Sequence, residues 1–262
     1  MSSNEKYQHF VIPELQEFWK EHRDDYINSG LTDGVFLPHV FDKYDRCNKK
    51  IFYIGQDAPY WLNEECMTTL FDQNKYLQYV LINNEVMRPL EKRFAWGNNS
   101  SAFWPMVIKL HMYLMTNTWY NDINNISSQD LEWLETIGYG NANSIPLLRT
   151  IWNYWEDSDI QQMNYYDVVR STYCFNHLGA IIENFEPDTI IILGCSFNAG
   201  SFFREIDILP YGAFTYKEHG VHAEFINHKG KKIRIIWTYN PNYYKFIGEN
   251  MYSIANKIKK YA

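Results

Sequence analysis

One short apolar segment most constrains the fold of this 262-residue chain. Residues 189–194 read TIIILG, in which four large aliphatic residues follow a β-branched threonine and precede a glycine. A run this short and this apolar indicates a strand covered on both faces, as parallel strands of α/β proteins are. No apolar run in the chain is long enough to predict a membrane span.

Two similar runs, residues 50–55 (KIFYIG) and 233–239 (IRIIWTY), also predict buried strands. A strand-like stretch covers about 133–139, and helical periodicity covers residues 12–26, 101–114, 166–183 and 243–261. Short strands that alternate with helices predict a three-layer α/β/α fold with a short, mainly parallel central sheet. We expect a single domain over residues 1–262, with its core at about 50–245 and the terminal helices packed on it.

Charge and aromatic content limit the classes of partner. The formal net charge is −7, from 24 basic and 31 acidic residues. This balance disfavours a protein that coats nucleic acid indiscriminately, because that role requires broad neutralisation of phosphates. A confined basic groove is still compatible with it, and an aromatic content of 18% supplies both core residues and flat surfaces for bases.

The cysteines and the start of the chain favour a cytoplasmic location. The four cysteines are scattered and form no C-x-x-C pair, so they give no zinc or iron–sulfur signature. The first residues lack the basic and then apolar pattern of a secretory signal. We therefore expect a cytoplasmic protein with reduced thiols and without a membrane partner, and we expect its activity to need no metal or organic cofactor.

Polar, turn-forming residues follow three of the predicted strands, at residues 55–57 (GQD), 141–144 (NANS) and 240–242 (NPN). Ligands of open α/β sheets bind at the carboxyl ends of strands, which makes these segments candidates for one site. Asp57 would lie just beyond its strand, where a carboxylate can hold or activate water. A simpler interpretation also stays open, since such residues form ordinary turns and Asp57 can act only as a cap.

The segment GQDAPYW, residues 55–61, resembles the first motif of the uracil-DNA glycosylase superfamily, which reads GQDPYH in its best-known branch, with Ala58 inserted. Asn240-Pro241-Asn242 resembles the start of the second motif in the mismatch-directed uracil/thymine branch, NPSGLS, with Asn242 in place of serine. Phe103-Trp104, the stretch YGNANSIP and the run TIIILG resemble a helix start, a base-pocket strand and the central strand of the superfamily. The five elements occur in the order of the superfamily.

This resemblance implies a DNA glycosylase that hydrolyses the N-glycosidic bond of uracil or another modified base, as in base-excision repair. Asp57 would position water, while Asn240, the turn at Gln56 and Asn143, or alternatively Asn141, would hold the base. The stacking ring would come from Phe71, Phe103 or Trp61, and Tyr60 would exclude the methyl group of thymine. Pro241, Asn242, Tyr243 and Lys245 would contact single- or double-stranded DNA, and Tyr243, Tyr244 or Phe246 would act as the wedge.

A second function stays open. The GQDPYH branch has a histidine in its second motif, where this chain has the neutral amide of Asn240. In this second interpretation, the chain is a uracil-DNA glycosylase-like protein that binds nucleotides or nucleic acid and has lost the ability to cleave the N-glycosidic bond.

Two lysine- and arginine-rich stretches, at residues 43–50 and 229–234, flank a DNA groove or are ordinary solvated surface. His219, His222 and His228 lie in a hairpin-like segment, and we interpret them as surface residues in preference to a metal cluster.

Overall fold

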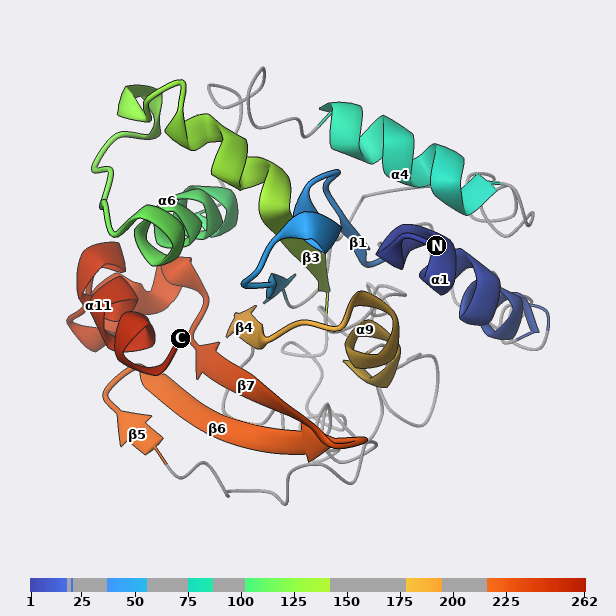
Figure 1. Ribbon diagram of the computed structural model, residues 1–262. Helices are drawn as coiled ribbons and strands as arrows, with labels where there is room; N and C mark the ends of the chain where they lie inside the picture. The colour runs from blue at the N-terminus through green and yellow to red at the C-terminus, as the bar shows by residue number, and fades with distance from the viewer. Residues whose placement is uncertain (18–19, 21–36, 56–74, 87–101, 142–177, 195–215) are drawn as a thin grey trace, which may run out of the picture.

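The structure is a computed structural model, and it describes residues 1–17, 20, 37–55, 75–86, 102–141, 178–194 and 216–262 (Figure 1). Seven strands form one sheet in the order β1-β3-β2-β4-β7-β6-β5. Their bounds are β1 (His39–Val40), β2 (Ile51–Gly55), β3 (Ile137–Asn141), β4 (Thr189–Leu193), β5 (Tyr216–Glu218), β6 (Val221–His228) and β7 (Lys231–Thr238). The run TIIIL thus forms β4, the middle strand of this order, and the strand predictions around residues 51, 190 and 235 are confirmed.

The sheet is parallel only at its centre. Strands β3, β2, β4 and β7 run parallel to one another, whereas β1 pairs antiparallel with β3, and β6 with both β7 and β5. The expectation of a mainly parallel sheet is therefore wrong for its flanks. The cause is a tight turn between β6 and β7, where Lys229 and Gly230 both have positive φ, of 50° and 82°. A two-residue turn of this kind joins antiparallel strands only.

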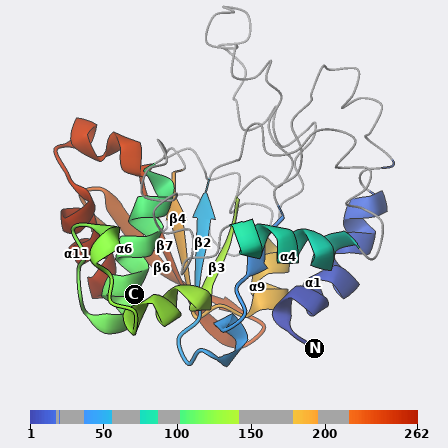
Figure 2. The same ribbon diagram turned by 90° about the horizontal axis from the view of Figure 1, so that it is seen from above.

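Helices cover both faces of the sheet, so the predicted three-layer arrangement is present (Figure 2). Helices α1 (Ser3–Phe10), α4 (Lys75–Val86) and α9 (Leu178–Phe185) lie on one face, and α6 (Phe103–Thr116) and α11 (Met251–Tyr261) lie on the other. Along β4, Ile190 and Ile192 enter the core cluster of the first face, and Ile191 and Leu193 enter that of the second. The alternation of side chains explains why this strand is apolar at every position.

The helix predictions differ in accuracy. Helix α6 closely matches the helix expected at 101–114, and residues 12–17 and 20 are helical within the expected 12–26. Helix α1 was not expected, although Ser2 and Glu5 form a capping box at its start. Of the helix expected at 166–183 the structure describes only residues from 178 onward, which belong to α9. No helix in the described ranges is both long and apolar enough to cross a bilayer.

Two expected elements are divided in the structure. The tail, expected as one helix from residue 243, instead contains the 3-10 helix η5 (Pro241–Ile247), then Gly248 with a φ of 73°, then α11 with Asn250 as its N-cap. A left-handed glycine ends a helix, and an N-capping asparagine starts a new one. The stretch expected as a strand at 133–139 begins with the 3-10 helix η3 (Asp130–Thr136), and β3 starts only at Ile137.

Candidate functional site

The carboxyl ends of the four parallel strands meet at one edge of the sheet. The register pairs Gly55 with Asn141, Ile54 with Ile192, and Leu193 with Thr238, so the strands end at nearly the same level. In Figure 2 the strands β2 and β4 point to the top of the picture, which is this edge. Six of the predicted site residues lie outside the described residues: Gln56, Asp57, Tyr60, Trp61, Phe71 and Asn143.

Asn141 and Phe103 meet above the end of β2. A Cβ atom added to Gly55 would lie 2.6 Å from Oδ1 of Asn141 and 3.4 Å from Cε2 of Phe103. The amide of Asn141 therefore lies across the glycine, and its residue is 7% exposed. The predicted residue Phe103 is at this edge, next to the point where the chain continues toward Asp57. A buried amide is normally hydrogen-bonded, so Asn141 is held in place at the end of its strand.

Sequence reasoning placed Asn143 ahead of Asn141 as the residue that faces the pocket. The structure describes Asn141, and it lies at the edge as the last residue of β3. No signal in the sequence separates the two asparagines, because positions 141 and 143 have the same parity along an extended strand. The placement of Asn141 leaves the position of Asn143 untested.

Phe103 is the first of a series of aromatic rings that contact one another. Its ring contacts Trp104 edge-on at a centroid distance of 5.4 Å, and Trp104 contacts Tyr139 edge-on at 4.9 Å. Tyr139 donates a hydrogen bond from its hydroxyl to Nε2 of His39, at 2.5 Å, while Nδ1 of His39 donates to the carbonyl of Leu37 at 2.8 Å. These contacts hold the rings in fixed positions behind the edge of the sheet.

His39 and His111 are buried histidines that the sequence did not single out. Burial lowers the pKa of His39 to about 4 and that of His111 to about 3. His111 lies 3.2 Å through Nδ1 from the Tyr53 hydroxyl, and its Nε2 lies 3.0 Å from the carbonyl oxygen of Trp133. Both rings are therefore neutral and hydrogen-bonded, which makes them part of the core.

Asn240 lies after the end of β7 and serves as the N-cap of η5. Its Oδ1 accepts a hydrogen bond from the backbone N–H of Asn242 at 3.0 Å. Its Nδ2 would lie 3.4 Å from a Cβ on Gly194, whose φ of 126° is one that side chains rarely adopt. The cap interaction thus fixes the amide so that its N–H₂ group lies over the end of β4. The capping role and a role as hydrogen-bond donor are compatible, because they use different atoms.

The residues after Asn240 form an exposed aromatic and basic surface. Pro241 is buried at the first turn of η5, while Asn242, Tyr243 and Lys245 are exposed. The rings of Tyr243 and Phe246 lie 5.9 Å apart and are 58% and 84% exposed. Tyr244, the remaining candidate wedge, is 1% exposed and is excluded from that role. Phe246 is the most exposed of these rings, which its sequence alone did not indicate.

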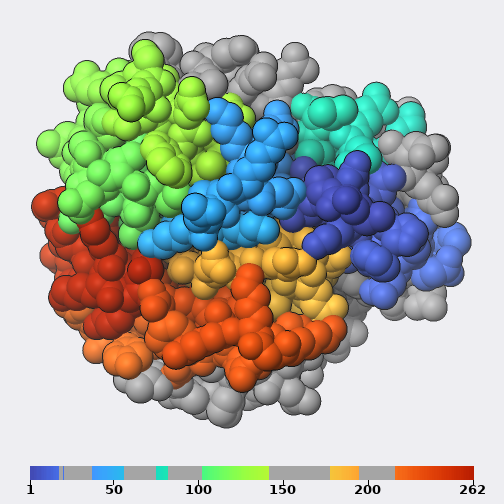
Figure 3. Space-filling view, viewed as in Figure 1, coloured from blue at the N-terminus to red at the C-terminus, as the bar shows by residue number. Residues whose placement is uncertain are grey.

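The two basic stretches lie at the opposite edge of the sheet. Lys50 precedes β2 and Lys231 begins β7, so both are at the amino ends of parallel strands. Figure 3 shows this edge, with the blue residues 37–55 beside the gold of residues 178–194 and the orange β6–β7 hairpin. Ion pairs bind Lys231 to Asp188 at 3.6 Å and Lys43 to Glu132 at 2.9 Å. Of the two interpretations left open for these stretches, the structure therefore favours solvated surface, because strand direction separates them from the carboxyl edge.

The three histidines of the hairpin region are held in separate places. His219 donates from Nε2 to the carbonyl of Ile247, at 2.8 Å, and Nε2 of His228 lies 3.1 Å from Glu183. His222 is half-buried against Trp237, and burial, with a smaller effect of Lys217, lowers its pKa. These three histidines make more contacts with neighbouring residues than was expected for solvated surface residues. Within the described parts of the chain no three histidine, cysteine or acidic side chains are grouped to bind a metal ion.

Comparisons of the chain with protein-family models, with curated proteins and with solved structures find no match.

Proposed function

We propose that the protein is a DNA glycosylase that hydrolyses the N-glycosidic bond of uracil or another modified base. One observation carries the proposal beyond the resemblance of the motifs. The ends of the strands that carry the two motifs, Gly55 and Asn240, belong to one edge of the sheet, with the amide of Asn141 and the ring of Phe103 beside the first of them. The order of the strands also agrees with the resemblance, since the TIIIL run is the middle strand.

The proposed reaction separates charge between the sugar and the base. As the N-glycosidic bond breaks, the electron pair leaves with the base, and positive charge develops on the sugar as in glycoside hydrolysis. Asp57 would position water for addition to the sugar carbon and take up its proton. The N–H₂ group of Asn240 would donate to the carbonyl of the leaving base, which carries the developing negative charge.

Recognition of the base would use the ring and the buried amide. A base that leaves the stack of its strand needs a flat side chain to stack on and polar groups for its edge. Phe103 supplies a half-buried ring, and Asn141 supplies an amide that is held in place over Gly55. Tyr243 and Phe246 would stack on bases of the strand outside the pocket, and Lys245 would contact a phosphate.

A binding function without cleavage is the second candidate. The specific observation in its favour is the hydrogen bond between Asn240 and Asn242. This bond gives Asn240 a capping role, and that role alone accounts for an asparagine at this position without a part in catalysis. A neutral amide also stabilises a leaving anion less than a charged donor does.

A base-release assay on labelled oligonucleotides separates the candidates. The substrates carry uracil in a single strand, uracil opposite guanine or adenine, thymine opposite guanine, or hypoxanthine, each at low and at moderate salt. Under the proposal the protein releases at least one base, and Asp57→Asn lowers the rate by about 10²-fold or more while the thermal unfolding curve is unchanged. Salt-sensitive binding without release supports the second candidate. If the protein shows no base release and no oligonucleotide binding, both candidate functions are contradicted.

A further inference from the structure

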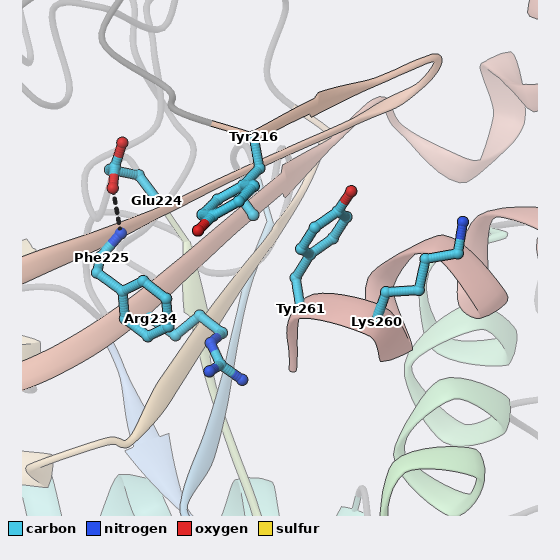
Figure 4. A pocket seen from close by; sticks show the side chains of 7 residues that line it. Tyr216, Glu224, Phe225, Arg234, Lys260 and Tyr261 are labelled. Atoms are coloured by element: carbon cyan, nitrogen blue, oxygen red, sulfur yellow. Dashed lines mark hydrogen bonds between the residues drawn. The ribbon is translucent and has the colours of Figure 1, made fainter.

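A pocket of about 230 Å³ lies between the strands β5, β6 and β7 and the end of α11 (Figure 4). Its walls include Tyr216, Glu224, Phe225, Arg234, Lys260 and Tyr261. Arg234 is opposite Phe225 in the register of β6 and β7, and it pairs with Thr189 at the start of β4. The described residues that line this pocket include none of those used by the proposed function.

Arg234 has unused hydrogen-bonding capacity in this pocket. Its Nε is buried and has no hydrogen-bond partner, and within the described residues its guanidinium forms no ion pair. The guanidinium carbon lies over the ring of Phe225 at 4.5 Å. Arg234 is only partly buried, and the planar fork of donors of its guanidinium matches a carboxylate or a phosphate. A buried Nε without an acceptor therefore indicates a missing anionic partner.

Two lysines lie near Arg234, and neither offers an unpaired charge inside the pocket. Lys260 binds Glu218 through Nζ at 2.9 Å and 3.2 Å, so its stem lines the pocket while its charge is already paired. Nζ of Lys232 lies 4.0 Å from the centre of the Phe225 ring, and Lys232 is not among the residues that line the pocket. The carboxylate of Glu224 accepts from the backbone N–H of Phe225 at 2.7 Å. Among the described residues that line the pocket, Arg234 is thus the cation whose charge is not paired with a carboxylate.

Aromatic rings form the remaining wall. The rings of Tyr216 and Tyr261 lie 5.6 Å apart with an angle of 34° between their planes, and Figure 4 shows both above the guanidinium of Arg234. With Phe225 they give the pocket three flat faces around a cationic group. Flat faces of this kind bind planar rings through stacking and burial of apolar surface. A volume of about 230 Å³ limits the ligand to a small molecule.

We propose that this pocket binds a small planar ring compound that carries one carboxylate or phosphate group. The anionic group would accept two hydrogen bonds from Arg234, and the ring would lie against Tyr216 and Tyr261. Carboxylate and phosphate share the geometry that a guanidinium recognises, and direct comparison of the two in solution decides which is preferred.

Calorimetric titrations with benzoate and phenyl phosphate test the proposal, with acetate and benzyl alcohol as the probes that lack the ring or the charge. Benzoate or phenyl phosphate is expected to bind at least about tenfold more tightly than acetate and benzyl alcohol, because each of these keeps only one of the two interactions. Equal affinity for acetate would show an anion contact without ring recognition and would overturn the proposal. So would the absence of saturable binding of both ring anions up to about 10 mM.

Two variants isolate the role of Arg234. Arg234→Met removes the donors but keeps a long side chain over Phe225, and Lys232→Met removes an equal charge from the same ring outside the pocket. The first is expected to weaken ring-anion binding by about tenfold or more, and the second by less than about threefold. An equal loss in both variants would show a diffuse electrostatic attraction and would contradict the site. The comparison of probes on the unaltered protein keeps the test valid if Arg234→Met does not fold.

Discussion

The side-chain oxygen of Asn141 occupies the space that a side chain on Gly55 would need. An added Cβ would lie 2.6 Å from this oxygen, and the two residues are paired across β3 and β2. The position of the amide at the candidate site thus depends on the absence of a side chain on the neighbouring strand. A contact this short cannot be accommodated without movement, because the interior on both sides is closely packed.

Replacement of this glycine should therefore be costly. We expect Gly55→Ala to lower the free energy of unfolding by about 1–3 kcal/mol, since Asn141 and the ring of Phe103 must move. Urea denaturation measures this change. The matched control is Gly179→Ala in α9, where an added Cβ meets nothing within 4 Å. There alanine should be neutral or stabilising by up to about 1 kcal/mol, and an equal loss in both variants would contradict the packing argument.

Asn240 allows its two roles to be separated by substitution. Asn240→Ser retains a good N-cap acceptor and should change the free energy of unfolding little, whereas Asn240→Ala should lower it by about 1 kcal/mol. Both variants lose the N–H₂ donor over Gly194. If that donor stabilises the leaving base, both should lose about 10²-fold or more in base-release rate. A rate that falls only in the alanine variant would assign Asn240 to capping alone.

The exposed pair Tyr243 and Phe246 should act in binding and not in stability. We expect the double variant Tyr243→Ser and Phe246→Ser to weaken oligonucleotide binding by about tenfold or more, because each stacked base is worth about 1–3 kcal/mol. Unfolding should change by less than about 0.5 kcal/mol, as for other exposed positions. Fluorescence anisotropy with a labelled oligonucleotide measures the affinity. Phe10→Ser, at a ring 58% exposed on α1, is the control and should bind normally.

The two edges of the sheet should differ in their contact with phosphates. Lys245 lies beside the candidate site, whereas Lys231 lies at the other edge and is paired with Asp188. We expect Lys245→Ala to reduce the slope of log affinity against log salt by about 1, which corresponds to the loss of one phosphate contact. Lys231→Ala should leave the slope unchanged. A smaller slope in the second variant would place nucleic acid at the amino edge instead.

The buried histidines predict how stability depends on pH. Because burial lowers the pKa of His39 to about 4 and of His111 to about 3, from 6.5, the unfolded chain binds protons at a higher pH than the folded chain. Their contribution to stability is complete above pH 6.5 and is lost as the pH falls toward 4 and then 3.

The slope between these limits should reach about 1.4 kcal/mol per pH unit for each histidine. Urea denaturation from pH 4.5 to 7 measures it. The double variant His39→Phe and Tyr139→Phe removes one histidine together with the hydroxyl that binds it. It should flatten the slope by about 1.4 kcal/mol per pH unit and leave the part due to His111. An unaltered slope would contradict a neutral His39.

Local pattern was sufficient to predict the central strands and not the chain path around them. The run at Ile190 predicts a strand because both faces are covered, and each side chain then has an apolar neighbour. The tail gave the wrong helix start because Gly248 interrupts a sequence whose composition is helical on both sides. The start of β3 was placed about four residues early, because the apolar residues of η3 precede Ile137 directly.

The candidate site was predictable as an edge of the sheet and only partly as a set of residues. Strand order and direction decide which polar turns meet, and these are tertiary properties. They bring Asn141 and Phe103 together across the end of β2. They also carry Lys50 and Lys231 to the opposite edge, although each precedes a strand that leads to the site. The sequence indicated Arg234 only as part of a basic stretch, because its place in the pocket depends on the β5–β6 hairpin and α11.

The brevity of the outermost strands bears on how the protein behaves at high concentration. In the part of the chain that the structure describes, the sheet ends at β1, which has two residues, and at β5, which has three. An outer strand offers its unpaired backbone groups as a template on which a further chain can add. Strands this short leave little length for such addition, and the exposed Lys217 on β5 adds charge. The described edges thus disfavour edge-to-edge aggregation.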